Sequence, residues 1–195
     1  MRAVIQRVSS ASVTVDSNVV SSISNGLMCL IGIGDDDTAK DSEYIVNKIL
    51  SLKVFDDPAT GTMWKKSVKD IEGEILCVSQ FTLMAKTIKG AKPDFHKAMG
   101  GELSRPLYAS LLESMRRVYV PSRIKGRYTL RPILPPLTQL NIDGQFGAMM
   151  SVSLTNEGPV TLTIDSRKFE YTPVAEASNK KKPTEINGTE IPTGN

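Results

Sequence analysis

The sequence predicts a β-rich α/β fold, in which an antiparallel or mixed twisted sheet, or a barrel, is flanked by two main helices. Segments whose apolar residues recur at every second position outnumber those with helical spacing. Two stretches have apolar residues three and four positions apart, as in an amphipathic helix. The 195 residues, of which 40% are hydrophobic and 23% charged, suit one globular domain with its own core.

Several segments are predicted to be β-strands. Residues 27–33 are continuously apolar, which indicates burial on both faces of a sheet. At 156–159 the sequence Asn-Glu-Gly-Pro predicts a turn between a strand at 146–155 and another at 160–164. The first of these is predicted to face the core with Phe146, Ala148, Met150, Val152 and Leu154. The other predicted strands cover residues 4–8, 11–16 and 74–83.

Two helices are predicted, at residues 41–52 and 105–119, because each carries an apolar stripe. Before the first helix, Thr38 and Asp41 have the spacing of a capping box, which satisfies free N–H groups at a helix start. Pro106 fits the first turn of the second helix, where a missing N–H costs no hydrogen bond.

Residues 1–170 are predicted to form one domain with an inserted loop at about 126–141. That loop shows neither helical nor strand periodicity and contains three prolines. From residue 171 to 195 the chain is polar and includes consecutive lysines at 180–182. This composition predicts a disordered C-terminal tail.

Composition and charge exclude several classes of protein. The formal net charge of +3 is mildly basic, which permits an RNA partner without requiring one. No apolar run approaches the roughly 20 residues that span a bilayer, and the first residues lack the apolar core of a signal peptide. We therefore expect no membrane association and a cytoplasmic location. Cys29 and Cys77 lie in apolar runs and are predicted to be buried thiols.

The chain has few of the residues that common catalytic sites use. His96 is its only histidine, so a histidine base would have to be this residue, which we expect to be exposed in a loop. One histidine and two cysteines without ligand spacing cannot form a standard zinc site. No glycine-rich phosphate loop is present. We expect no metal and no cofactor, so an enzyme of this sequence would act on a reactive substrate.

Short motifs near both ends of the chain resemble one known family. Residues 79–83 read Ser-Gln-Phe-Thr-Leu, and residues 156–161 read Asn-Glu-Gly-Pro-Val-Thr. Further matching segments lie at 1–8, 89–95 and 146–150. In this order the motifs are similar to those of the D-aminoacyl-tRNA deacylase family, over residues 1–125 and 142–166.

The resemblance implies the dimeric, β-rich deacylase fold, a metal-free site, and hydrolysis of the ester that joins a D-amino acid to the 3′ end of tRNA. It implies that a Gly-Pro element with a cis peptide bond reaches into the pocket of the neighbouring subunit. The resemblance assigns the catalytic pocket wall to Ser79, Gln80, Phe81 and Thr82. The predicted substrate-binding residues are Gly158, Pro159, Asn156, Thr161, Arg7 and Met149.

An aminoacyl ester is already activated, and the ribose 2′-hydroxyl of tRNA adjoins its carbonyl. Backbone N–H groups directed at the oxyanion, each worth a factor of roughly 10² to 10³, can therefore suffice. In a regular strand Ser79 and Phe81 would face one side and Gln80 and Thr82 the other, so all four side chains could not enter one pocket. Thr82 is a possible nucleophile, but the sequence shows no base for it, and we predict a positioning role.

The Gly-Pro element is expected to sort handedness with main-chain atoms. Arg7 is expected to hold it by hydrogen bonds to its carbonyls. Once the substrate's ammonium and ester carbonyl are fixed, an L side chain would collide with this backbone and a D side chain would point outward. Glycine has no side chain, so mischarged glycyl-tRNA is expected to be hydrolysed as well.

Three other interpretations remain open at this stage. The first is a DNA-binding or other nucleic-acid-binding protein without enzymatic activity, which uses the basic tail at 180–182. The second is a hydrolase that uses His96 as its base. The third is a structural or interaction protein with neither activity.

Overall fold

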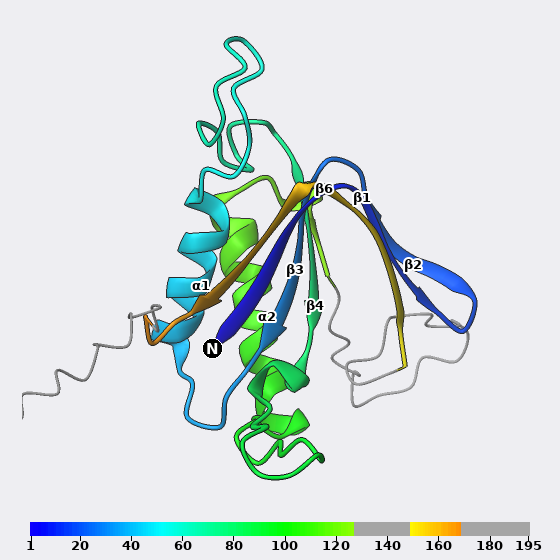
Figure 1. The fold of residues 1–195 in the computed structure, drawn as a ribbon, viewed down its shortest axis with the longest axis vertical. Helices are drawn as coiled ribbons and strands as arrows, with labels where there is room; N and C mark the ends of the chain where they lie inside the picture. The colour runs from blue at the N-terminus through cyan, green and yellow to red at the C-terminus, as the bar shows by residue number, and fades with distance from the viewer. Residues whose placement is uncertain (127–148, 169–195) are drawn as a thin grey trace, which may run out of the picture.

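The computed structural model describes residues 1–126 and 149–168, which form one mixed β-sheet and two α-helices (Figure 1). The elements are β1 (Arg2–Val15), β2 (Asn18–Ile23), β3 (Gly26–Gly32), α1 (Ala39–Ser51), β4 (Glu74–Ser79), the 3₁₀ turn η1 (Phe81–Met84), α2 (Gly101–Val118), the 3₁₀ turn η2 (Pro121–Arg123), β5 (Ile124–Lys125) and β6 (Ser151–Asp165). The predicted class, a twisted β-rich sheet with two main helices, is confirmed.

Strand β1 organises the sheet because it is long enough to have several partners. Its first half pairs with β3 and its second half with β2, and β6 runs antiparallel along its other edge. Beyond β3 the pairing becomes parallel, to β4 and then to the short β5. In Figure 1, β1 and β6 bend together at one end of the molecule, while β3 and β4 point towards the other.

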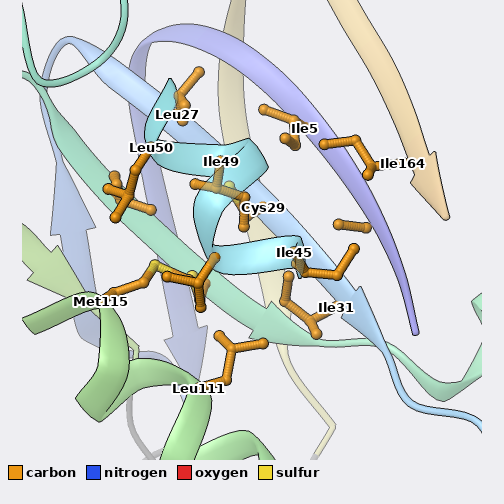
Figure 2. Close-up of a cluster of buried hydrophobic side chains, with 14 of the residues drawn as sticks. Ile5, Leu27, Cys29, Ile31, Ile45, Ile49, Leu50, Leu111, Met115 and Ile164 are labelled. Atoms are coloured by element: carbon orange, nitrogen blue, oxygen red, sulfur yellow. The ribbon is translucent and has the colours of Figure 1, made fainter. Parts of the chain in front are cut away.

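The main core lies between the sheet and the two helices, which pack against each other. Alternate residues of β3 and β4 face α1 and α2, and Figure 2 shows Ile31, Ile45 and Leu111 meeting there. A second cluster on the opposite face includes Met28 and Val78. Because each fully buried Ile or Leu contributes about 1.5–3 kcal/mol, the two clusters hold the ends of β3 and β4 in place.

The observed strands differ from the predicted ones in several places. The strands predicted at 4–8 and 11–16 are one strand, β1. Residues 151–165 also form one strand, β6, which continues through the predicted turn at 156–159. Strand β2 and the two-residue β5 were not predicted. Of the residues predicted to face the core, Met150 and Leu154 pack against the second cluster, whereas Val152 is exposed. Phe146 and Ala148 lie outside the described residues.

The helix starts follow local hydrogen bonding. The capping box is confirmed, since the Thr38 backbone N–H donates to Asp41 Oδ2 over 2.8 Å. Helix α2 begins at Gly101, so Pro106 is not in its first turn as predicted but inside the helix. Cys29 and Cys77 are buried as predicted and are direct partners in the parallel ladder. Their hydrogen bond, together with burial, raises the pKa of the Cys29 thiol.

Other predictions concern regions that lie outside the described residues, namely the inserted loop at about 126–141 and the tail at 171–195. The extent of one domain over residues 1–170 therefore stays a prediction. Within the described ranges, neither helix combines the length and apolar character that crossing a membrane requires.

Candidate active site

A pocket of about 600 Å³ opens where the parallel strands β3 and β4 end. Its walls come from these strand ends, η1, the segment before α2, the start of α2 and residues 149–152 at the beginning of β6. Open α/β sheets commonly bind ligands beyond the carboxyl ends of parallel strands. Of the predicted site residues, Ser79, Gln80, Phe81 and Met149 line this pocket.

Two aromatic rings form one wall of the pocket. The ring centroids of Phe81 and Phe95 lie 5.1 Å apart with the planes at 68°, an edge-to-face arrangement. This contact steadies the Phe81 side chain, which is 57% exposed. Phe95 was not predicted as a site residue, although it belongs to the 89–95 segment that carries part of the resemblance. Phe95 lies in a loop, and helical or strand periodicity cannot indicate which loop residues line a pocket.

The strand predicted over residues 74–83 ends at Ser79, and the expected alternation beyond it is wrong. The Gln80 N–H donates the last ladder bond, to the Ile31 carbonyl over 2.7 Å, and the chain then turns into η1. Because the backbone turns, Ser79, Gln80 and Phe81 all reach the same pocket. Thr82 does not line it.

The η1 turn presents polar groups of two kinds. The Gln80 side-chain amide donates a hydrogen bond to the Thr82 hydroxyl oxygen, which fixes both side chains. Within the described ranges, the backbone N–H groups of Phe81 and Thr82 donate no hydrogen bond. The first N–H groups of a helical turn characteristically lack internal acceptors, so these two are available to an anion beside the pocket.

A second feature, the 157–160 bulge, interrupts β6. Gln6 of β1 pairs with Thr161 and Val8 pairs with Asn156, so residues 157–160 all lie opposite the single residue Arg7. The Asn156 side-chain amide donates to the Thr161 hydroxyl over 3.2 Å and closes the base of the bulge.

The peptide bond between Gly158 and Pro159 is cis, and both residues are exposed. Gly158 has a φ of +109°, which L side chains rarely adopt. A Cβ atom at Gly158 would also lie 2.9 Å from Arg7 Nη2 and 3.0 Å from Val160 Cγ2. Glycine is therefore required here by both backbone conformation and space.

Arg7 is the anchor of the 157–160 bulge. Its side chain is 12% exposed, Nε donates to the Glu157 carbonyl over 3.3 Å, and Nη1 donates to the Val54 carbonyl over 2.8 Å. Asp56 lies 3.7 Å from Nη1, and the guanidinium carbon lies 6.0 Å from the centre of the Phe55 ring. The predicted bond from Arg7 to the Gly-Pro loop is present, at the carbonyl that precedes Gly158.

One protomer does not bring the two features together. Across the sheet, Ser79 of β4 pairs with Ile31 of β3, and Ile31 pairs with Ala3 of β1. The 157–160 bulge of β6 lies on the other edge of β1, opposite Arg7. Ser79 and the 157–160 bulge are therefore separated by three strand spacings across the sheet and by four residues along β1. This separation amounts to about 20 Å. In Figure 1 the bend of β6 and the ends of β3 and β4 are at opposite ends of the sheet. The pocket groups Ser79, Gln80, Phe81 and Met149, with Thr82 nearby, and the bulge groups Arg7, Asn156, Gly158, Pro159 and Thr161.

The histidine required by one alternative interpretation does not line the pocket. The His96 side chain is 93% exposed and interacts with Asp94, two residues earlier in the same loop. In residues 1–126 and 149–168, no group of three or more potential metal-ligating side chains comes together.

Comparison with known proteins gives a consistent result. A family profile described as D-Tyr-tRNA(Tyr) deacylase matches residues 4–165. The D-aminoacyl-tRNA deacylase of Saccharomyces cerevisiae is 48% identical over 166 residues, which cover 85% of this chain and 99% of the yeast protein. D-aminoacyl-tRNA deacylase 1 of Danio rerio is also 48% identical, over 85% of this chain and 71% of its own length.

Solved structures agree on the fold. A c-Myc DNA unwinding element binding protein superposes with a TM-score of 0.72 at 46% identity, covering 85% of this chain and 98% of its own. A probable eukaryotic D-amino acid tRNA deacylase superposes with a TM-score of 0.65 at 24% identity, which supports the fold alone. The chain therefore belongs to the D-Tyr-tRNA(Tyr) deacylase family.

Proposed function

We propose that this protein hydrolyses the ester bond of D-aminoacyl-tRNA, and of mischarged glycyl-tRNA, to release the free amino acid and tRNA. Family membership supports the reaction class. The observation that carries the mechanism is the arrangement of the exposed 157–160 bulge, anchored by Arg7, at the end of the sheet opposite the pocket. The proposed setting is translation quality control in the cytoplasm.

The pocket suits the 3′-terminal nucleoside of a tRNA. Nucleobases that are free of pairing are commonly bound by stacking on aromatic side chains. The Phe81 and Phe95 rings and the apolar side chains of Met99 and Met149 offer such a surface. With the base held there, the ester would lie beside η1.

Catalysis in this proposal depends on backbone N–H groups. The amides of Phe81 and Thr82 stabilise the oxyanion that forms when the ester carbonyl is attacked, at a factor of roughly 10² to 10³ per donor. The ribose 2′-hydroxyl beside the ester assists the attack. The Thr82 hydroxyl accepts a hydrogen bond from Gln80, and among the described residues no titratable side chain forms a hydrogen bond with it, so we assign it to positioning.

A homodimer completes the site. In an isologous dimer the same two surfaces meet twice, so the 157–160 bulge of each protomer can enter the pocket of the other. This arrangement removes the separation of about 20 Å that strand spacing imposes within one protomer. It also gives a reason for the exposure of Gly158 and Pro159.

Selection of handedness follows from the rigidity of the bulge. Main-chain atoms at Gly158 and Pro159, fixed by Arg7 and by the bond from Asn156 to Thr161, occupy the direction that an L side chain would take. A D side chain points away from them, and glycine has none. The bulge therefore excludes L side chains without recognising any particular side chain, and many D-amino acids are accepted.

The test is to offer the purified protein D-tyrosyl-, L-tyrosyl- and glycyl-tRNA in the presence of a chelator. The proposal predicts release of D-tyrosine and glycine and a far slower release of L-tyrosine. Hydrolysis of L-tyrosyl-tRNA at the D rate would contradict the selection mechanism. Absence of D-tyrosyl-tRNA hydrolysis would contradict the function.

A second candidate is binding to DNA, since the 46% identical solved structure is named as a DNA unwinding element binding protein. In this chain that activity would use the basic tail at 180–182. A chain ending at Lys168 separates the two functions. Loss of DNA binding with full deacylation would support both, and unchanged DNA binding would exclude the tail as its source.

A further inference from the structure

A hairpin formed by residues 55–66, the 55–66 hairpin, presents apolar side chains to solvent. It rises beyond α1 at the end of the molecule where β6 bends (Figure 1). Trp64 is 51% exposed and Met63 is 65% exposed. Two large apolar side chains in sequence are thus left in water, although their burial against a partner would be favourable.

The backbone holds Trp64 outward. Trp64 has a φ of +60°, which is a rare conformation for a bulky residue. The positions on either side are fixed, since Phe55 exchanges backbone hydrogen bonds with Lys66 over 3.0 Å and Asp57 donates to the Thr62 carbonyl over 2.9 Å. Strained conformations of this kind persist where the surroundings enforce them, and they concentrate at binding sites.

Among the described residues, one charged residue of the 55–66 hairpin, Lys65, takes part in no ion pair. Asp56 pairs with Arg7 over 3.7 Å and Asp57 with Lys66 over 3.9 Å. Lys65, adjacent to Trp64, is exposed and has no carboxylate within 4.0 Å among the described residues. An exposed aromatic side chain followed in sequence by an exposed lysine suits a nucleotide, whose base stacks on the ring and whose phosphate is attracted to the cation.

The 55–66 hairpin and the 157–160 bulge share one anchor. Arg7 donates to the Val54 carbonyl at the base of the hairpin and to the Glu157 carbonyl at the base of the bulge. The Lys65 N–H donates to the carbonyl of Phe55, the residue after Val54. Trp64, which precedes Lys65, is therefore close in sequence to the base of the hairpin that Arg7 holds. A partner pocket that receives the bulge would therefore face the end of the molecule that carries the 55–66 hairpin (Figure 1).

We propose that Trp64 of one protomer stacks on an unpaired nucleobase of the tRNA 3′ end whose aminoacyl group occupies the partner's pocket. This inference rests on the proposed function and extends it. The 157–160 bulge reads the amino acid, and the 55–66 hairpin beside it contacts the single-stranded nucleotides that lead into the same pocket. Each protomer thus supplies both elements to the other's substrate.

Intrinsic fluorescence tests the contact directly, because Trp64 is the only tryptophan in the chain. Uncharged tRNA is titrated into the full-length protein, and binding is followed independently by the anisotropy of labelled tRNA. The proposal predicts that intact tRNA quenches the emission and that tRNA without its unpaired 3′ nucleotides does not. Binding without quenching, or equal quenching by both RNAs, would overturn it, as would an absence of tRNA binding.

Substitution gives a second readout. Trp64→Ala should raise the KM for D-tyrosyl-tRNA by about 5- to 150-fold, the loss expected for one stacked base, with little change in kcat. Trp64→Phe keeps an aromatic ring and should give a KM close to that of the wild type. Met63→Ala is the matched control and should change the KM little. A normal KM for Trp64→Ala would overturn the proposal while leaving deacylation intact. If instead the wild type fails to hydrolyse D-tyrosyl-tRNA, the proposed function fails and the fluorescence result still decides the contact.

Discussion

Arg7 Nε donates a hydrogen bond to the backbone carbonyl of Glu157 over 3.3 Å, at the point where the β1–β6 ladder changes register. A second bond from the same guanidinium, to the Val54 carbonyl, ties the 157–160 bulge to the end of α1. The bond from Asn156 to Thr161 closes the base of the bulge, and Arg7 is the side chain that links the bulge to a neighbouring segment of the chain.

Arg7→Ala should therefore release the bulge. Hydrogen bonds to charged groups contribute about 1.5–3 kcal/mol, so we expect a fall of at least roughly 10-fold in kcat/KM for D-tyrosyl-tRNA. Preference over L-tyrosyl-tRNA should fall as well, since a loose bulge rejects L side chains less well. Deacylation rates on the two substrates measure both effects.

Asp56→Ala is the control for Arg7→Ala. It removes the exposed ion pair to Arg7 but keeps both bonds to carbonyls, and such pairs contribute about 0–1 kcal/mol. Its kinetics should stay close to those of the wild type. Equal damage from both substitutions would show that charge at this position, and not anchoring of the bulge, is what matters.

Gly158→Ala should impair activity through both conformation and contact. The new Cβ atom requires a rare backbone conformation at φ +109° and would displace Arg7 Nη2 or Val160. Gly90→Ala is the matched control, because Gly90 also has a positive φ, of +71°, but no atom within 4 Å of its Cβ position. Both variants should lose about 1–2 kcal/mol of stability in urea unfolding. A loss of D-tyrosyl-tRNA hydrolysis is expected for Gly158→Ala alone.

Thr82→Val distinguishes positioning from covalent catalysis. Valine keeps the shape and removes the hydroxyl that accepts the bond from Gln80. A positioning role predicts a loss of no more than about 10-fold in single-turnover rate, on the order of one hydrogen bond. If Thr82 were the nucleophile, activity would vanish in this variant and return in Thr82→Ser.

Acid should weaken the fold through Asp41. Burial by itself raises the pKa of this carboxyl, but hydrogen bonds from Ser166 and Thr38 outweigh it and lower the pKa from 3.8 to about 2. Because the folded pKa is depressed, the stabilisation is present above pH 4 and is lost as pH falls towards 2. Urea unfolding between pH 5 and 3 should show a smaller loss for Asp41→Asn than for the wild type. Glu43→Gln, on the exposed face of α1, should leave the wild-type profile unchanged.

Periodicity predicted the parts of the fold that depend on local pattern. The apolar run at 27–33 marked the buried β3, and the spacing of Thr38 and Asp41 marked the start of α1. These features depend on burial and on hydrogen bonds within a few residues, so neighbouring sequence is enough to reveal them.

Features that depend on distant partners were missed. β4 ends at Ser79, where the last ladder bond to Ile31 forms, and nothing in the alternation of 74–83 signals this. The 157–160 bulge looked like a turn because its pairing with β1 on both sides is a long-range property. Phe95 reaches the pocket through a contact with Phe81 that no local spacing encodes.

The central claim is that the 157–160 bulge of one protomer completes the pocket of its partner, and mixing two defective variants tests it most directly. Gly158→Ala damages the bulge, and Phe81→Ala damages the pocket at an exposed residue that the fold does not need. If the variants are unfolded and refolded together in equal amounts, half of the dimers pair one chain of each kind. Each such dimer has one site with both parts intact, which predicts about a quarter of the wild-type D-tyrosyl-tRNA hydrolysis. Activity no higher than that of the two variants refolded separately would contradict the account, because every site would then be built within a single chain.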